Sequence, residues 1–478
     1  MQRWHITAGL TATAILAAVL VPTFVGEPAV SIPSSLDPTP SDPTPLDPPP
    51  PTPPGLETAS AEGPLTLSAA LDQGALLHGS SEARYLVMEV AAPDLPGEDR
   101  RPVHLSVVMD TSGSMNGEGK ITNARMAAKE LASLMRPADT LSLVTFSGTA
   151  TVQLSTHAVT DAARIGRIVD SIRPEGGTNL HDGLSAGMAQ LDRPDLVGVK
   201  RVVLLSDGRI TMGISGQGPL AHQAGSGVAQ GISVSALGLG LDYDEDLLAV
   251  ISDAGGGSYR FVDRPGQLAQ LFSDELQQMG SVIGREATVD VSLPSGVTLE
   301  ELYGYDASLR PGGFGVFLGD VHGGETRKIV ARVHVEPAAT GRLGVAEVGL
   351  RYVDADSGHL TMASADVDAL VTTDNQVAAG SLDNAVLAKA TRARSAKLLD
   401  ESARAWEAGD RTANRSKLEE AERLLLAVGR LAGNAGLLDD ADAYRKQKEA
   451  FEAAPSDSDA GSYQVKKAKE VSRAQSRR

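Results

Sequence analysis

The sequence predicts an α/β fold in which a doubly wound domain is inserted in or flanked by a β-sandwich and is followed by a C-terminal α-helical hairpin. Between residues 101 and 280, apolar strands such as VHLSVVMD and RVVLLSD alternate with amphipathic helices, which is typical of a mostly parallel sheet covered on both faces. On either side of this region, a two-residue alternation of apolar and polar side chains indicates half-buried strands. After Ser381 the apolar residues recur at helical spacing.

Composition limits the class of protein. A chain of 478 residues has room for two or three domains, and 42% hydrophobic residues suffice for their cores. The absence of Cys excludes disulfides, thiolate metal sites and a cysteine nucleophile. A formal net charge of −18 argues against a general nucleic-acid binder, because attraction to phosphate needs a basic face. Aromatic residues, at 4%, are also too few for extensive base stacking.

The N-terminal segment, residues 1–26, has the pattern of an export signal, with Arg3 ahead of the apolar run Ile6 to Val25. The run is long for a signal peptide and lacks a clean A-x-A cleavage site, so a cleaved signal peptide and an uncleaved membrane anchor are both open. Either predicts a protein of the cell envelope or periplasm, or a secreted one, because the positive charge lies on the N-terminal side.

Residues 27–58 are dominated by Pro, which favours extended polyproline II and predicts a stiff linker. The alternative is a ligand for a Pro-binding domain. Residues 59–100 then contain LTLSAAL and YLVMEVAA, and residues 281–374 contain further strands between Gly and Pro turns. We favour one β-sandwich split in sequence over a separate N-terminal hairpin, because a few isolated strands cannot bury a face alone.

Residues 381–455 form the helical region, with Gly409 marking a turn between two long helices and a short third helix expected over LDDADAYRKQKEAFEAA. Residues 456–478 turn polar and basic, and the pattern predicts a disordered tail. Attraction of this tail to an anionic surface or partner is the alternative. Its basic residues are Lys466, Lys467, Lys469, Arg473, Arg477 and Arg478.

The most informative motif lies at the end of the first apolar strand of the α/β region, where Asp110, Ser112 and Ser114 alternate in DTSGSM. Further along, GGTNL places Thr178 after two glycines, and RVVLLSDG places Asp207 at the end of another strand. Ligands of doubly wound sheets bind at the carboxyl ends of the strands. Hydroxyl and carboxylate oxygens there are suited to a hard divalent cation.

Together these pieces resemble the metal-ion-dependent adhesion site of von Willebrand factor type A domains, whose fold is Rossmann-like. The resemblance implies that Ser112, Ser114 and Thr178 contact Mg²⁺, or Mn²⁺ or Ca²⁺, through their hydroxyl groups, and that Asp110 and Asp207 act largely through bound water. It also implies an open coordination position for an acidic side chain of a protein partner. The DTSGSM spelling and the domain order resemble, more loosely, bacterial members of the calcium-activated chloride channel and inter-α-trypsin-inhibitor heavy-chain group.

We therefore expect a non-enzymatic, exported or membrane-tethered protein that mediates cation-dependent protein binding or adhesion. A metal-dependent hydrolase is the first alternative, with His181 and Asp182 as an imaginable acid/base pair, although capping residues of a helix are the expected role. A scaffold or assembly factor of an envelope complex is the second. Glycine runs near Gly238 and Gly255 lack the Lys of a P-loop, so neither predicts a nucleotide site.

Overall fold

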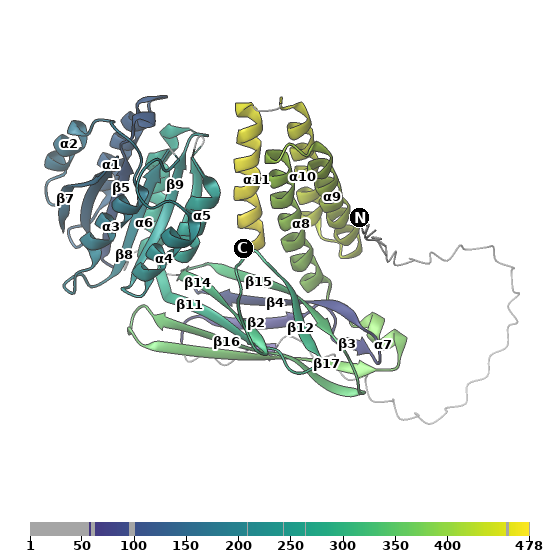
Figure 1. Cartoon of the computed structure of the whole chain (residues 1–478). Coiled ribbons are helices and arrows are strands. Elements are labelled where there is room, and N and C mark those ends of the chain that lie inside the picture. Colours follow the sequence, from purple (N-terminus) through teal and green to yellow (C-terminus); the bar gives the residue numbers. More distant parts are fainter. Residues whose placement is uncertain are drawn as a thin grey trace, which may run out of the picture. The chain divides into compact units, whose positions relative to one another are not determined.

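The computed structural model describes residues 57–58, 63–94, 101–207, 209–241, 243–262, 264–455 and 458–477 (Figure 1). The expected signal or anchor and all but the end of the Pro-rich linker lie outside these residues. None of the helices within the described ranges is long and apolar enough to cross a membrane.

The α/β domain has a six-stranded sheet in the order β10-β9-β8-β5-β6-β7, in which only β7 runs antiparallel to its neighbour. Every residue of β5 and β9 is buried, as expected for strands covered on both faces. The strands are β5 (Val103–Asp110), β6 (Thr140–Phe146), β7 (Ala150–Ala158), β8 (Val199–Ser206), β9 (Ile232–Leu239) and β10 (Gly256–Val262).

Helices cover both faces of this sheet (Figure 1) and form two separate apolar cores with it. One core contains side chains of α1, α2 and α6, and the other contains side chains of α3, α4 and α5. The predicted doubly wound architecture is confirmed. The helices are α1 (Lys120–Leu134), α2 (Ala162–Ser171), α3 (Leu180–Leu191), α4 (Gln217–Val228), α5 (Glu245–Ala254) and α6 (Leu268–Gly280), with short 3-10 turns η1 (Gly113–Asn116) and η2 (Pro265–Gln267).

The β-sandwich consists of a five-stranded sheet, β1-β2-β4-β15-β12, and a six-stranded sheet, β13-β14-β11-β16-β17-β3. β4, which precedes the α/β domain, pairs with β15, which follows it, from Glu82↔Val335 to Ala91↔Thr326. The strands on either side of the α/β domain therefore form one sandwich with one core. They are β1 (Glu57–Thr58), β2 (Thr66–Leu71), β3 (Ala75–Leu77), β4 (Glu82–Ala91), β11 (Val282–Ser292), β12 (Val297–Tyr303), β13 (Ser308–Arg310), β14 (Gly313–His322), β15 (Thr326–Val335), β16 (Gly341–Asp354) and β17 (Leu360–Thr372).

The helical region begins with the short α7 (Asn375–Gly380) and continues with α8 (Asn384–Glu407), α9 (Arg411–Leu431) and α10 (Ala435–Ala453). Gly409 has a φ of 78° in the turn between α8 and α9, a conformation that glycine adopts without strain. The expected third helix is present as α10, but it is not short: it begins at Ala435, has 19 residues and contributes Leu437, Tyr444 and Phe451 to the helical core.

The prediction of a disordered basic tail is also wrong. Asp459–Arg477 forms the helix α11, whose Val465 and Ala468 are buried in the core of the helical region. Its Lys466 and Lys469 are 3% and 2% exposed, because both ammonium groups form ion pairs with carboxylates of the α/β domain. Two lysines of a basic run that suggested solvated charges are thus buried in ion pairs with acidic side chains.

Candidate metal centre

The five predicted site residues lie at the carboxyl edge of the parallel sheet. Asp110 is the last residue of β5, and Asp207 directly follows β8, the strand hydrogen-bonded to β5. Ser114 lies in the η1 turn that follows β5, and Ser112 directly precedes this turn. Thr178 lies two residues before α3. The side chains come from three loops that the strand order brings to one edge.

A chain of hydrogen bonds connects four of these residues. The backbone N–H of Ser112 donates to Asp110 Oδ1 over 2.8 Å, and the Ser112 and Ser114 hydroxyl oxygens are 3.0 Å apart. Ser114 Oγ donates to Asp207 Oδ1 over 2.8 Å. Asp110, Ser112 and Asp207 are at most 3% exposed, whereas Ser114 is exposed. The cluster is therefore enclosed by protein except on the Ser114 side.

Thr178 reaches this edge through its loop. Gly113 N donates to Gly176 O over 3.2 Å, which joins the loop of Thr178 to that of the two serines. Gly176 adopts a φ of 74°, which explains the need for glycine there. Thr178 N donates to Thr211 Oγ1 over 2.8 Å, and Thr178 is 3% exposed. Within the described residues, no side-chain hydrogen bond links Thr178 to the other four.

The two carboxylates of the site are buried, and one of them, that of Asp207, has a positively charged partner. Burial raises the pKa of Asp110 to about 6; hydrogen bonds from Ser206 and Ser112 oppose this shift, and the nearby charge of Asp207 adds to it. Lys120 Nζ lies 2.9 Å from Asp207 Oδ2, and their side chains are 5% and 0% exposed. The cluster therefore carries an excess of negative charge when both carboxyl groups are ionised.

Three residues that complete the site were missed by sequence reasoning. Ser206 Oγ donates to Asp110 Oδ2 over 2.6 Å, Lys120 pairs with Asp207, and Thr211 accepts from Thr178 N. Ser206 precedes Asp207 at a strand end, so its position was a usable signal. Lys120 begins α1 and Thr211 lies in a loop, and nothing in their local sequence marks them.

The donor set suits a hard divalent cation. It offers three hydroxyl groups and two carboxylates, all oxygen, and the excess negative charge is of the sign that a cation balances. In the described part of the chain, no group of three or more His, Cys, Asp or Glu side chains is arranged to hold a metal. Three of the five donors are neutral hydroxyl groups, and such ligands would leave a bound cation able to accept another anionic oxygen.

Asp182 has a structural role at the start of α3. Asp182 N donates to the capping oxygen of Asn179, and Asp182 Oδ2 accepts a hydrogen bond from Ala150 N over 2.6 Å. The carboxylate is therefore used to tie α3 to β7.

Comparison with known proteins matches the α/β domain, about a third of the chain, to a family model. Residues 104–274 match the von Willebrand factor type A domain. YfbK of Escherichia coli (strain K12) is 26% identical over 230 residues, covering 48% of this chain and 40% of YfbK. The human inter-alpha-trypsin inhibitor heavy chain H2 is 29% identical over 175 residues, covering 35% of this chain and 18% of its own. The chain thus spans less than half the length of either relative.

Two solved structures share the fold well beyond the α/β domain. The von Willebrand factor type A protein from Catenulispora acidiphila superposes with a TM-score of 0.66 at 19% identity, covering 87% of this chain and 98% of that one. The ArnB paralog VWA2 from Sulfolobus acidocaldarius gives a TM-score of 0.57 at 17% identity, covering 86% and 99%. The sandwich and helices therefore belong to an architecture that recurs with this domain.

Proposed function

Because the chain contains a von Willebrand factor type A domain, a domain that commonly mediates metal-dependent protein–protein interaction, we propose that it is a non-enzymatic binding protein. A divalent cation, with Mg²⁺ as the first candidate, is held by Asp110, Ser112, Ser114, Thr178 and Asp207. The cation captures an acidic side chain of a protein partner. The protein acts outside the cytoplasm, at the cell envelope or after secretion, as the N-terminal sequence suggests.

The observation that carries this proposal is the hydrogen-bonded series Ser112, Ser114 and Asp207. Ser112 Oγ lies 3.0 Å from Ser114 Oγ, which in turn lies 2.8 Å from Asp207 Oδ1. These residues follow the adjacent strands β5 and β8. Ser114 is exposed while its neighbours are buried, so a partner oxygen has access from that side. A cation held largely by neutral hydroxyls keeps its attraction for an additional carboxylate.

The surface beside the site supports binding of a protein over binding of a small ion alone. Met212 and Ile214, in the loop after β8, are 49% and 45% exposed. Met212 lies against the loop that carries Thr178, since a Cβ on Gly177 would be 2.9 Å from Met212 Sδ. Exposed apolar side chains at the rim of a polar site are typical of protein interaction surfaces.

Hydrolysis is the weaker interpretation of the same site. A hydrolase needs a group that takes a proton from metal-bound water. Asp182, the carboxylate suggested by the sequence, is already an acceptor for Ala150 N.

The proposal is tested by capture from an envelope extract with the full chain immobilised. We expect bound proteins that appear with Mg²⁺, elute with chelator, and are absent when Ser112→Ala is used. Ser133→Ala, an exposed serine of α1, is the matched control and should behave as the wild type. Capture that is unchanged by chelator and by Ser112→Ala would refute a cation-bridged contact.

A further inference from the structure

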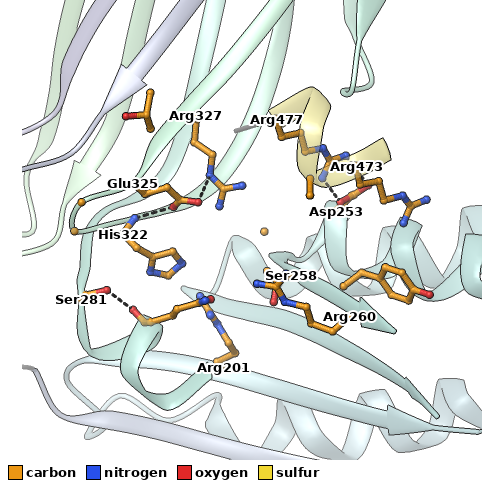
Figure 2. Close-up of a pocket in the computed structure, with 18 of the residues that line it drawn as sticks. Arg201, Asp253, Ser258, Arg260, Ser281, His322, Glu325, Arg327, Arg473 and Arg477 are labelled. Atoms are coloured by element: carbon orange, nitrogen blue, oxygen red, sulfur yellow. Dashed lines mark hydrogen bonds and ion pairs between the residues drawn. The ribbon is translucent and has the colours of Figure 1, made fainter. Parts of the chain in front are cut away.

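A cavity lined by none of the five predicted cation ligands lies between several elements of the fold. Its volume is about 510 Å³, within the usual range for small-molecule pockets. Three parts of the fold form its walls: β10 of the α/β domain, the β14–β15 turn of the sandwich, and the C-terminal half of α11. Figure 2 shows the charged side chains that surround this space.

Three of the five arginines in the wall have a carboxylate oxygen within 3.1 Å. Arg201 is buried between Glu275 and Asp320, at 2.8 Å from each. The other two pairs are Arg327 with Glu325 at 3.1 Å and Arg477 with Asp253 at 2.6 Å. The wall is therefore not strongly positive overall. Two of these pairs join parts of the fold: Arg201–Asp320 links β8 to β14, and Arg477–Asp253 links α11 to α5.

Arg260 and Arg473 differ from these three. Among the described residues, Arg260 has no ion pair or hydrogen bond, although it lies on β10 and lines the cavity. Arg473 has its Nη1 buried without an acceptor, and the carboxylate oxygen paired with its Nη2, that of Asp246, is 4.0 Å away. Figure 2 shows both side chains on the side of the cavity opposite His322 and Arg327.

A buried guanidinium N–H without an acceptor lowers stability, because it has lost water and gained nothing. An oxyanion in the cavity would supply the missing acceptors. The planar fork of Arg matches phosphate, sulfate and carboxylate groups through two parallel hydrogen bonds. Ser258 also lines the cavity, but its hydroxyl group already donates a hydrogen bond to Glu275 Oε2 over 3.1 Å.

We propose that this cavity is a binding site for a small molecule bearing a phosphate, sulfate or carboxylate group, with Arg260 and Arg473 as the residues that hold the oxyanion. The volume exceeds that of inorganic phosphate, so the natural ligand is larger than the group that the arginines recognise. Because β10, the β14–β15 turn and α11 all contribute, an occupied site would also tie α11 to the α/β domain.

The test uses the full chain and three probes, inorganic phosphate, sulfate and citrate, each added at constant ionic strength against sodium chloride. Calorimetry and thermal unfolding should show saturable binding and a rise in the unfolding midpoint with at least one probe. The probe that binds most tightly identifies the group, phosphate-like or carboxylate. Arg260→Gln should reduce the affinity at least tenfold.

Two controls make the test specific. Arg310→Gln, at an exposed arginine of β13 that pairs with Asp290, should leave probe binding unchanged. Asp110→Asn should also leave probe binding unchanged. The test of this cavity is therefore independent of the test of the cation site. Absence of saturable binding by all three probes, or equal affinity in Arg260→Gln and the wild type, would overturn the proposal.

Discussion

Lys120 donates a hydrogen bond from Nζ to Asp207 Oδ2 over 2.9 Å, and both side chains are buried. The other oxygen of the same carboxylate accepts from Ser114. One carboxylate thus joins the ammonium group of Lys120 to the hydroxyl groups proposed to hold the cation. Lys120 neutralises part of the site, which predicts weak cation affinity and a strong residual attraction of the bound cation for a partner carboxylate.

Lys120→Met should make the cation-free protein less stable and the cation site tighter. Removing one partner of a buried ion pair typically costs about 3–5 kcal/mol, because the remaining charge is left uncompensated. A divalent cation then becomes the available counter-charge, so Mg²⁺ should raise the unfolding midpoint more in Lys120→Met than in the wild type. Equal stability and an equal Mg²⁺ effect in both proteins would show that the pair has no such role.

Gly177→Ala should weaken cation binding with little effect on the cores. A Cβ at this position would lie 2.7 Å from Thr211 Oγ1, the atom that accepts the hydrogen bond of Thr178 N. The added methyl group must therefore displace the loop that positions Thr178. Gly218→Ala, where a Cβ meets nothing within 4 Å, is the matched control. Calorimetric titration with Mn²⁺ should separate the two variants, and identical affinities would contradict the placement of Thr178 at the site.

The contact of α11 with the α/β domain should be sensitive to acid. Burial alone would raise the pKa of Glu245, but the ammonium groups of Lys466 and Lys469, 2.6 and 3.0 Å away, lower it to about 2. When the pKa of a carboxyl group is lower in the folded state, its ionised form stabilises the protein at pH values above its ordinary pKa of 4.5. This contribution disappears as the pH falls toward 2.

Glu245→Gln should therefore be less stable than the wild type at pH 6, and the difference should shrink between pH 4.5 and 2. Urea unfolding at several pH values measures it. Glu130→Gln, at an exposed residue of α1, serves as the control and should show no such trend. A difference that stays constant over this range would mean that Glu245 is not held ionised by the two lysines.

The sequence predicted the parts of the fold that depend on local periodicity. Continuous apolar strands such as β5 and β8 are typical of a parallel sheet that is buried on both faces. The carboxyl ends of such strands lie at one edge of the sheet, so the sequence alone places Asp110 and Asp207 there. The alternation in β4 and β15 likewise indicated half-buried strands, although their pairing across the whole α/β domain had to come from the structure.

What could not be predicted depends on contacts between distant residues. Lys469 and Glu245 are 224 positions apart, and a basic run such as that of α11 looks the same whether its partners are water or buried carboxylates. The same holds for Lys120, 87 positions from Asp207. Charge compensation of this kind is a property of the tertiary structure, and no local pattern records it.

Calorimetric titration of Mg²⁺ and Mn²⁺ into the full chain tests most directly whether Asp110 and its neighbours bind a divalent cation. Asp110→Asn keeps the size of the side chain and an oxygen for Ser112 N, so the fold should persist. Asp161→Asn, at the cap of α2, is the matched control, since Asn caps a helix as well as Asp. We predict saturable binding by the wild type and Asp161→Asn and its loss in Asp110→Asn; binding that survives in Asp110→Asn would contradict the proposed site.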